Sequence, residues 1–360
     1  MVLHMGRLGK VKPVEVKVRL EDYVHLVLGQ KKTGKTTLFK ELVELHYGGD
    51  MTKGFLAGFE KGFQALDGLY AEKIQDWQDW EDYVEEFVED RKNIDFRLIG
   101  IDTIDYFVEM AIEETLQASR RKDGKKVTSI NEAMGGFSRG KQYCLKLMRD
   151  SIAKLQNSGY GVMFIGHVKL KKKSTGLLAD NLEFMQLSCN LTDDYASLFE
   201  DMADMITYLV LERDVDTSVE EVKARTAKSS VQLVFRSEDG GIDCGGRFKD
   251  LPTSLPYSAE NYLKAFEQGI KGSMKKPQTN EDIKEIAKKQ EIEKEKEVEL
   301  KTKKKTIEEM VNEVKAKFSE LGDGAKTRLA ELIQESGKEN LSSLSEEDRK
   351  IVEEMNELVK

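Results

Sequence analysis

The sequence predicts an α/β domain with a mainly parallel sheet, followed by a smaller all-helical region. Two observations predict this arrangement. Short apolar runs of strand length alternate with longer segments whose apolar residues recur at helical spacing. Beyond about residue 270 charged residues dominate, and Phe318 is the only aromatic residue. Alternation of strands and helices is typical of a sheet covered by helices on both faces.

The composition limits the class of protein. The chain has 360 residues, of which 39% are hydrophobic, and a net charge of −9. No stretch approaches the roughly 18 consecutive apolar residues of a membrane helix, and the start lacks a signal-peptide run. Cys144, Cys189 and Cys244 stand apart without CxxC spacing, so neither disulfides nor a zinc site are expected. A cytoplasmic protein is favoured, and the charge excludes a generally basic nucleic-acid coat but not a local basic patch.

Individual elements follow from the pattern. Val14, Val16, Val18 and Leu20 alternate with polar residues, which predicts a strand with one buried face. Apolar runs predict further strands over residues 23–28, 54–59, 96–101, 161–165, 206–211 and 231–235. Helical spacing predicts helices over residues 38–45, 77–88, 106–116 and 142–155.

The segment Gly-Gln-Lys-Lys-Thr-Gly-Lys-Thr, residues 29–36, has the GxxxxGK[ST] spacing of a P-loop. Glycines let successive backbone N–H groups face a phosphate, and the following helix adds its positive N-terminus. Lys35 is expected to reach the β- and γ-phosphates of ATP, and the Thr36 hydroxyl to bind Mg²⁺. A lysine-rich surface turn is the alternative, but a buried strand precedes the motif and an amphipathic helix follows it. The residues expected to bind ATP are Gly29, Gln30, Lys31, Lys32, Thr33, Gly34, Lys35, Thr36 and Thr37.

A second ligand for the metal is expected at the end of another strand. Asp102 follows the apolar run 98–101, so it lies at the carboxyl edge of a central strand, where open α/β sheets bind ligands. We expect it to hold Mg²⁺ through water, as the Walker B aspartate does. An aspartate that merely begins a loop is the alternative, and the upstream P-loop favours the metal.

The group that activates water has two candidates. Many P-loop ATPases place a glutamate directly after the Walker B aspartate, but here that residue is Thr103. A general base must reach the γ-phosphate, and Glu60 follows the strand over residues 54–59, at the same sheet edge. A solvated loop acid is the alternative interpretation of Glu60, and Asp105 is a weaker competitor for the role.

The order of these parts resembles the RecA-like ATPase core. A P-loop, the glutamate of Phe59-Glu60-Lys61, the Asp102-Thr103 pair and a polar residue after the fourth strand, His167, follow one another as in that family. The resemblance covers roughly residues 14–268 and is closer still to short phage-encoded RecA-like ATPases that act in single-strand annealing or recombination. It implies a RecA-like P-loop NTPase fold, Mg²⁺-dependent ATP hydrolysis, Glu60 as the water-activating group and a sensor role for His167.

His167 also departs from part of that family, because a recombinase usually carries glutamine at this place. Taken alone, His167 is equally well interpreted as a hydrogen-bonded structural histidine. The resemblance further implies a ring or filament in which a basic residue of the neighbouring subunit completes the site. Arg225, Lys228 and Arg236 lie near the matching strand, and no single one of them stands out.

Two basic clusters interrupt the acidic domain. The first spans residues 120–126, for which solvated surface is the simpler interpretation. The second leaves the sheet edge that holds the γ-phosphate and leads into a loop-like stretch; it comprises Lys169, Lys171, Lys172 and Lys173. In RecA-like proteins the matching segment is a DNA-binding loop, so the resemblance implies that these lysines bind single-stranded DNA.

Two further features point to the same partner. Phe184, in the same stretch, is expected either to stack on a base or to pack within the loop. The segment over residues 135–139 corresponds roughly to the other DNA loop of the family.

The rest of the chain divides into a tether and a module. We expect a RecA-like ATPase domain over residues 1–270, a charged linker or solvated helix over 271–305 and a helical interaction module over 306–360. Thr306 and Ser345 are expected to cap helices of this module, which would bind a protein partner.

Three functions are compatible with the sequence. The first is a Mg²⁺-dependent ATPase that binds single-stranded DNA and supports annealing or recombination in phage DNA metabolism. The second is a helicase or replication accessory ATPase, with translocation as its output. The third is a nucleotide-gated interaction protein whose helical tail recruits a partner.

Overall fold

The computed structural model describes residues 13–124, 127–174, 183–215, 227–274, 279–301, 307–318, 323–338, 341–345 and 348–358. The chain divides into two compact units, Met1–Val298 and Glu299–Lys360, and each is described by itself. In the described parts of the chain, no helix combines the length and apolar character needed to cross a bilayer. All three cysteines are free thiols.

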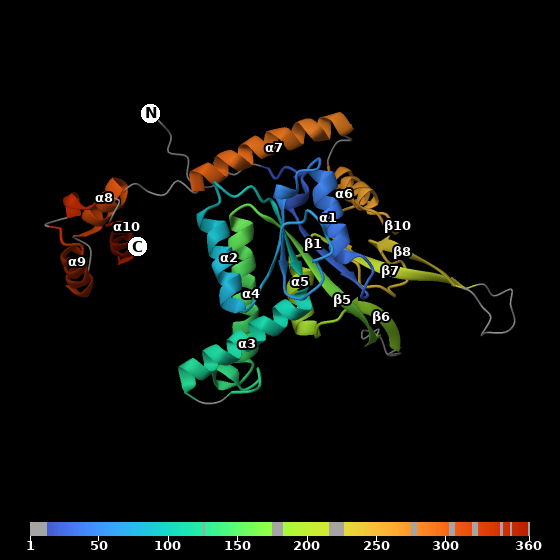
Figure 1. The fold of residues 1–360 in the computed structure, drawn as a ribbon, viewed down its shortest axis with the longest axis horizontal. Helices are drawn as coiled ribbons and strands as arrows, with labels where there is room; N and C mark the ends of the chain where they lie inside the picture. Colours follow the sequence, from blue (N-terminus) through green and yellow to red (C-terminus); the bar gives the residue numbers. More distant parts are fainter. Residues whose placement is uncertain are drawn as a thin grey trace. The chain divides into compact units, whose positions relative to one another are not determined.

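The described part of the first unit is built on a ten-stranded sheet (Figure 1). Its strands are β1 (Val24–Gly29), β2 (Gly54–Gly58), β3 (Ala71–Lys73), β4 (Leu98–Asp102), β5 (Gly161–Ser174), β6 (Glu183–Cys189), β7 (Met205–Val215), β8 (Ala227–Val234), β9 (Gly245–Gly246) and β10 (Ser254–Pro256). The order across the sheet is β10-β8-β7-β1-β5-β4-β2-β3, with β6 paired to β5 and β9 to β7. All pairs from β3 to β7 along this order are parallel. The mainly parallel α/β sheet predicted from the sequence is therefore confirmed.

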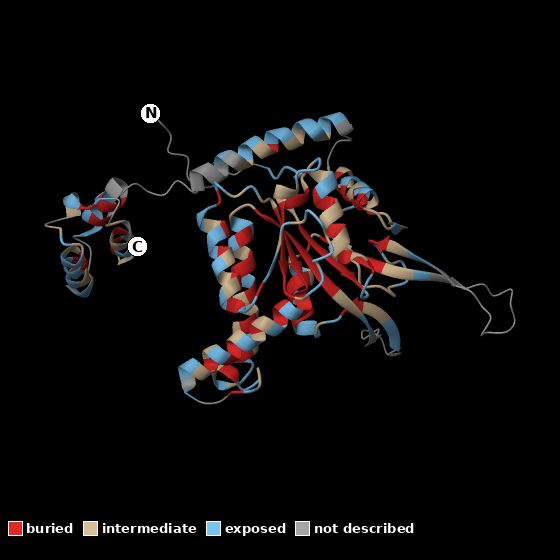
Figure 2. Ribbon diagram, in the orientation of Figure 1, coloured by how far each residue is buried: buried red, intermediate tan, exposed pale blue. Residues whose placement is uncertain are grey.

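Helices cover both faces of the sheet (Figure 1). They are α1 (Lys35–His46), α2 (Trp77–Glu89), α3 (Ile104–Asp123), α4 (Arg139–Asn157), α5 (Asp193–Met202), α6 (Ala259–Ser273) and α7 (Asn280–Lys301). Because side chains alternate along a strand, β1 supplies both cores. Leu26 and Leu28 pack with Trp80 and Phe107 of α2 and α3, whereas Val27 packs with the α1 and α6 side chains. The strands between these layers are buried along most of their length (Figure 2).

The strand order places the predicted functional residues at one edge of the sheet. Gly29 at the end of β1 is paired with His167 of β5, and Asp102 at the end of β4 is paired with Ile165 of the same strand. One strand, β5, therefore separates the P-loop strand from the strand that carries Asp102. Since all three strands are parallel, their carboxyl ends meet at this edge.

The segment over residues 14–20 is not a strand, contrary to the prediction. Residues 13–18 have no regular structure, and a 3₁₀ turn follows at Leu20–Asp22. Val18 and Leu20 are buried in the α1 and α6 core, and the backbone N–H of Val18 donates to the side chain of Gln290 instead of to a strand. Val18 and Leu20 are therefore buried because they pack against helices, and not because the segment pairs with another strand.

The stretch expected as a loop up to Cys189 contains the strand β6. β5 runs beyond the sheet and pairs antiparallel with β6, from Val168 opposite Cys189 to Ser174 opposite Glu183. We call this two-stranded extension, residues 168–174 and 183–189, the ribbon. The apolar pair Leu170–Leu187 lies on one of its faces, and that alternation of apolar and lysine residues is the strand signal that the prediction overlooked.

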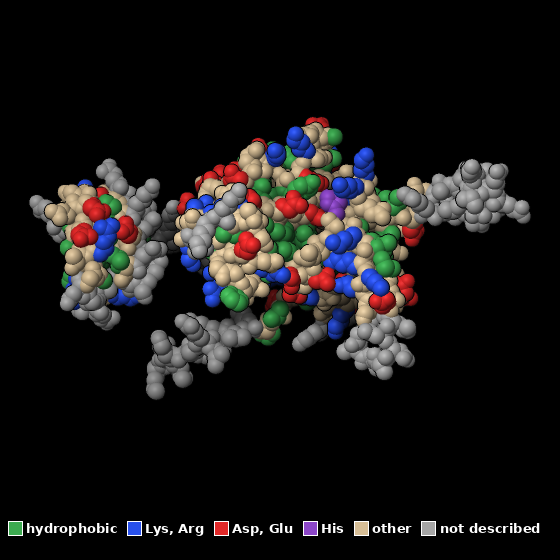
Figure 3. Space-filling model, turned by 90° about the horizontal axis from the view of Figure 1, so that it is seen from below, with side chains coloured by type: hydrophobic (Ala, Val, Ile, Leu, Met, Phe, Trp, Pro, Cys, Tyr) green, Lys and Arg blue, Asp and Glu red, His purple; other side chains and the backbone are tan. Residues whose placement is uncertain are grey.

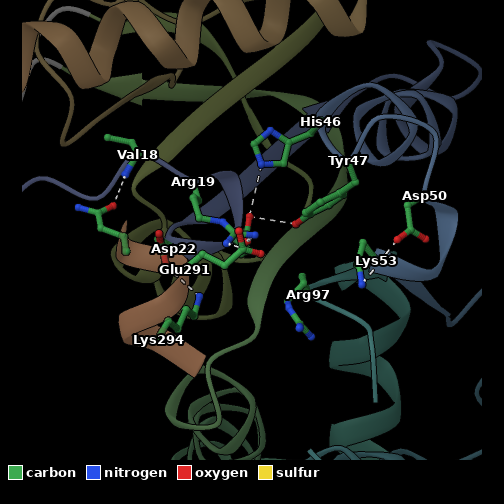
Figure 4. Close-up of polar contacts among 12 residues, drawn as sticks. Val18, Arg19, Asp22, His46, Tyr47, Asp50, Lys53, Arg97, Glu291 and Lys294 are labelled. Atoms are coloured by element: carbon green, nitrogen blue, oxygen red, sulfur yellow. Dashed lines mark hydrogen bonds and ion pairs between the residues drawn. The ribbon is translucent and has the colours of Figure 1, made fainter. Parts of the chain in front are cut away.

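Helix α7 packs on the first unit, which differs from the solvated tether expected over residues 271–305. Gln290 is 5% exposed; its side chain accepts from the N–H of Val18 at 3.2 Å and donates to the carbonyl of Val16 at 3.0 Å. Lys294 pairs with Asp22 at 2.8 Å (Figure 4). Ile283, Ile286 and Ala287 of the same helix pack against the α1 and α6 core. The charged helix is therefore held along one side by a short apolar face together with polar contacts.

The second unit consists of short helices around its own core. In its described part these helices are α8 (Ile307–Lys317), α9 (Asp323–Glu335) and α10 (Arg349–Leu358). The buried residues Val314, Leu332, Val352 and Met355 pack together. Ser345 precedes α10, and its N–H and hydroxyl both donate to the carboxylate of Asp348. Thr306, the other expected cap, lies outside the described residues.

Candidate functional site

The loop between β1 and α1 is shaped for a phosphate. Gly34 has a left-handed backbone with φ of 91°, which favours glycine, and it leads directly into the first turn of α1. A Cβ on Gly29 would lie 2.8 Å from the Thr33 hydroxyl and 2.9 Å from the Cβ of Leu209, so only glycine fits there. Glycine at the start of α1 also leaves the first N–H groups of the helix without a side-chain cap. These groups are the ones that bind phosphate at a helix N-terminus.

Lys35 lies inside this loop and is 7% exposed. Its Nζ donates to the carbonyl oxygens of Gly29 at 3.0 Å and Gln30 at 2.9 Å. Burial lowers its pKa, while the carboxylates of Asp102 and Glu60 act in the opposite direction. The ammonium group therefore lies at the centre of the loop, where it fits the β- and γ-phosphates of ATP.

Thr36 and Asp102 meet across β5 in spite of the 66 residues that separate them in sequence. The Thr36 hydroxyl donates to Oδ2 of Asp102 at 2.6 Å, and Asp102 is 5% exposed. Burial raises the pKa of Asp102 to about 6; the hydrogen bond from Thr36 lowers it and the charge of Glu60 raises it. A hydroxyl and a carboxylate are the hard oxygen ligands that Mg²⁺ prefers when phosphates supply the others. The bound metal would supply charge compensation at the phosphates.

The structure brings Glu60 to the same edge. Gly58 is paired with Asp102, and the N–H of Phe59 donates to the Asp102 carbonyl at 2.6 Å, so the next residue projects beside the end of β4. Glu60 is half-buried and influences the titration of both Lys35 and Asp102. This position allows a base to act on water beside a bound γ-phosphate.

Asp105, the competing base, is hydrogen-bonded on both carboxylate oxygens. It accepts from the backbone N–H of His167 at 3.0 Å and from the side chain of Asn190 at 2.9 Å. Burial alone would raise the pKa of Asp105, but the bonds from His167 and Asn190 lower it. An ionised carboxylate occupied in this way supports its neighbours and is poorly suited to deprotonate water.

A cleft of about 350 Å³ opens next to the P-loop. It is lined by Gln30, Lys31, Asp105, Tyr106, Glu109, His167, Val168 and Asn190. Basic and acidic side chains gather with a histidine on this side of the molecule (Figure 3). Two residues of the P-loop, Gln30 and Lys31, therefore line the same depression as His167.

The four lysines assigned to DNA lie on the ribbon, and three of them have acidic partners. Lys171 and Lys173 pair with Asp193 at 2.8 and 3.5 Å, and Lys172 pairs with Glu183 at 2.6 Å. Lys169 is exposed. The ribbon is thus basic but partly neutralised by its own surroundings.

Of the three basic residues considered for completing the site of a neighbouring subunit, the structure describes the side chain of one, Arg236. Arg225 and the side chain of Lys228 lie outside the described residues. Arg236 is exposed just after β8, and its backbone N–H donates to the carbonyl of Thr253.

Two further residues at the site were missed by sequence reasoning. Tyr257 donates to the carbonyl of Gly34 at 3.0 Å, and a Cβ on Gly34 would lie 2.9 Å from its hydroxyl. Asn190 supports Asp105 from the end of β6. Neither residue belongs to a sequence motif. The pairing of β6 with β5 brings Asn190 to Asp105, and the segment before α6 brings Tyr257 to Gly34 of the P-loop.

Comparison with known proteins agrees with this geometry. A family model described as an AAA domain matches residues 21–233, which include the P-loop, Glu60, Asp102 and His167. No curated protein matches the chain. The match spans more than half of the chain, and the nucleotide-binding ATPase activity of the family agrees with a P-loop that holds Lys35, Thr36 and Asp102 together. The chain belongs to the AAA domain family of P-loop ATPases.

Proposed function

We propose that the protein is a Mg²⁺-dependent, RecA-like ATPase that binds single-stranded DNA and supports annealing or recombination. The observation that carries the proposal is the ribbon, which begins at the sheet edge next to the nucleotide cleft. His167 lines the cleft, and the lysines begin two residues later on the same strand. A segment placed in this way can respond to the nucleotide and contact a polyanion.

The two faces of the ribbon differ in a way that suits a single strand. Lys169, Lys171 and Lys173 alternate along β5 and so share one face. Phe184 is paired with Lys173, lies on that same face and is 38% exposed. Lysines contact phosphates without reading sequence, and an exposed ring can stack on any base.

The ion pairs of these lysines do not argue against DNA binding. Lys172 and Glu183 are both mostly exposed, whereas Asp193 is mostly exposed but its partner Lys171 is 13% exposed. Exposed pairs contribute about 0–1 kcal/mol. A phosphate can therefore replace the Glu183 carboxylate beside Lys172 at little cost.

A second basic surface lies where α3 and α4 meet. A pocket of about 490 Å³ is lined by Lys122, Arg139 and Lys146 together with neutral side chains. Next to it Phe137 is 91% exposed, with a left-handed φ of 53°. The segment over residues 135–139 thus supplies one cation, Arg139, and an exposed ring beside Lys122 and Lys146, which supports the DNA-binding interpretation.

Two related proposals concern the oligomeric state and the cellular location of the protein. We infer a homo-oligomer, either a ring or a filament, and action in the cytoplasm of a bacterial host if the gene is carried by a phage. These inferences rest on the resemblance to phage RecA-like ATPases.

A nucleotide-gated interaction protein is the second candidate function, and one observation favours it. The described part of the second unit has its own core, including Val314, Leu332 and Met355. A separate core is expected of a module that binds a protein partner and is not needed for a passive extension. In that case ATP hydrolysis would be incidental to recruitment. A helicase accessory is the remaining alternative.

Steady-state ATP hydrolysis with and without single-stranded DNA tests the proposal. We expect Mg²⁺-dependent turnover that rises when a single strand is added and responds less to duplex DNA. Turnover that is indifferent to DNA, together with no measurable binding of a labelled single strand, would favour the interaction protein. Unwinding of a tailed duplex would favour the helicase accessory.

A further inference from the structure

Asp105 joins three parts of the molecule. It lies in the first turn of α3, three residues after Asp102, and is 8% exposed. Its Oδ2 accepts from the backbone N–H of His167 at 3.0 Å and lies 3.3 Å from Nδ1 of the same residue. Its Oδ1 accepts from the side chain of Asn190 at 2.9 Å. Both oxygens of one carboxylate are therefore committed to residues from other elements.

These two partners form the base of the ribbon. His167 is the last residue of β5 paired with β1, and β5 pairs with β6 from the next residue onward. Asn190 follows β6 directly, and its backbone N–H donates to the carbonyl of His167 at 2.8 Å. Asp105 thus ties both strands of the ribbon to the helix that begins beside the metal-binding aspartate.

The same carboxylate determines which nitrogen of His167 carries a proton. A carboxylate can only accept, so the 3.3 Å contact between Oδ2 and Nδ1 is a hydrogen bond only when Nδ1 carries the proton. Nε2 is then the nitrogen left for other contacts, and within the described residues it has no hydrogen-bond partner. His167 lines the cleft with Gln30 and Lys31 of the P-loop. The free nitrogen therefore belongs to the residue that borders both the cleft and the ribbon.

We propose that Asp105 is a positioning residue shared by the nucleotide cleft and the ribbon. It holds His167 as the Nδ1–H tautomer, in which Nε2 is a hydrogen-bond acceptor that can receive a bond from water at the phosphate end of a nucleotide. Through Asn190 it makes the base of the ribbon move with that imidazole. The coupling of this contact to DNA rests on the proposed function, whereas the tautomer does not.

A purely structural role makes a different prediction. A carboxylate in the first turn of a helix stabilises the helix through the macrodipole, and its loss would lower stability alone. Asp79 in the first turn of α2 offers a matched control, because it accepts from the backbone N–H of Gln75 and does not line the cleft beside the P-loop. Asp79→Ala should therefore lower stability slightly and leave the kinetics unchanged.

The first test is a long-range ¹H–¹⁵N correlation spectrum of histidine-labelled full-length protein, at a pH where the imidazoles are neutral. The chain has four histidines, and the His167 signals are assigned by their loss in His167→Gln. His25 is an internal reference for the opposite form, since its Nε2 faces the carbonyl of Leu20 and its Nδ1 the hydroxyl of Tyr262. We expect the Nδ1–H form at His167 and the Nε2–H form at His25. An Nε2–H form at His167 in the wild type would overturn the proposal without any variant at Asp105.

The second test is kinetic. In Asp105→Ala both acceptor oxygens are removed, so nothing holds the proton on Nδ1 and the tautomer of His167 should shift towards Nε2–H. We expect kcat to fall at least 10-fold with KM for ATP within about 3-fold of wild type, and any stimulation by single-stranded DNA to be lost. Unchanged kcat and tautomer in a folded Asp105→Ala would refute the positioning role.

Hydrogen exchange separates this inference from the proposed function. In the wild type, an ATP analogue should change the protection of backbone amides over residues 167–174 and 183–190 relative to ADP, and Asp105→Ala should abolish that difference. If the wild-type ATPase is indifferent to DNA, the proposed function fails while the tautomer and exchange results still decide the role of Asp105. Equal exchange with both nucleotides in the wild type would overturn the coupling.

Discussion

The two edges of the sheet use similar charged residues in opposite ways. At the amino edge Glu21 is 2% exposed and meets Arg19, the imidazole of His46 at 3.4 Å and the hydroxyl of Tyr47 at 3.0 Å (Figure 4). Despite burial, which acts the other way, the hydrogen bond to His46 and the charge of Arg19 lower the pKa of Glu21 to about 2.

The carboxyl edge is less complete. Lys35 is held only by backbone carbonyls, and within the described residues the carboxylate of Glu60 makes neither an ion pair nor a hydrogen bond. Burial raises the pKa of Asp102 to about 6, opposite in direction to the shift of Glu21. At the amino edge the buried charge of Glu21 is paired within the protein. At the carboxyl edge Lys35, Glu60 and Asp102 are charged groups that a ligand could contact. Changes at the amino edge should therefore affect stability, and changes at the carboxyl edge should affect turnover.

A large effect on turnover, with ATP binding retained, is expected for Glu60→Gln. Because an amide cannot take a proton from water, turnover should fall by about 10²- to 10⁴-fold while ATP binding is retained. Steady-state hydrolysis and equilibrium nucleotide binding measure the two quantities. Glu85→Gln, on the exposed side of α2, is the control. Wild-type turnover in Glu60→Gln would remove Glu60 from the mechanism.

The next effect should appear at the amino edge, in Glu21→Gln. The pKa of Glu21 falls from 4.5 to about 2 on folding, which corresponds to about 3 kcal/mol of stability. Since the folded pKa is the lower one, this contribution is present above about pH 4.5 and is lost as the pH falls towards 2. Denaturant unfolding should show the wild type losing stability between pH 6 and pH 3 more steeply than the variant.

Turnover of folded Glu21→Gln at pH 7 should stay close to that of the wild type, with Glu15→Gln as an exposed control. A large loss of kcat without a loss of stability would show that the two edges are not separable.

A smaller effect is expected on the ribbon. Replacement of Lys169, Lys171, Lys172 and Lys173 by alanine should weaken single-strand binding and flatten its salt dependence, by about 0.7 in log–log slope for each phosphate that the variant no longer neutralises. Fluorescence anisotropy across a salt series measures the slope. The same number of exposed lysines elsewhere, Lys92, Lys284, Lys288 and Lys289, provides the control. An unchanged slope would mean that the ribbon lysines are ordinary surface.

The smallest effect is expected from removing the second unit. Truncation after Lys301 should leave the stability and basal ATPase of the first unit unchanged, because α7 and its contacts remain. Truncation after Lys276 also removes Gln290 and Lys294, so it should lower the stability of the amino edge. Thermal unfolding of both truncations distinguishes them, and equal stability would show that α7 is a tether after all.

Most of the fold was predictable because strands and helices that bury a face leave a period in the sequence. The P-loop, Asp102 and Glu60 were predictable for a related reason, since each follows a buried strand and parallel strands end at one edge. The packing of α7 was not, because it combines only a few apolar residues, such as Ile283 and Ile286, with polar contacts of Gln290 and Lys294 to a segment far away in sequence. Asn190 and Tyr257 were missed for the same reason, as their partners become visible only after the strands are paired.

The most direct test of the central claim compares Lys35→Ala with Lys53→Ala in both ATP binding and hydrolysis. Lys35 lies at the carboxyl edge within the P-loop, whereas Lys53 lies at the amino edge and pairs with Asp50 and Asp95. Lys35→Ala should greatly weaken ATP binding and abolish hydrolysis, because the lysine compensates the charge of the β- and γ-phosphates. Lys53→Ala should behave as the wild type does. Near-normal turnover in a folded Lys35→Ala would contradict the assignment of the nucleotide site.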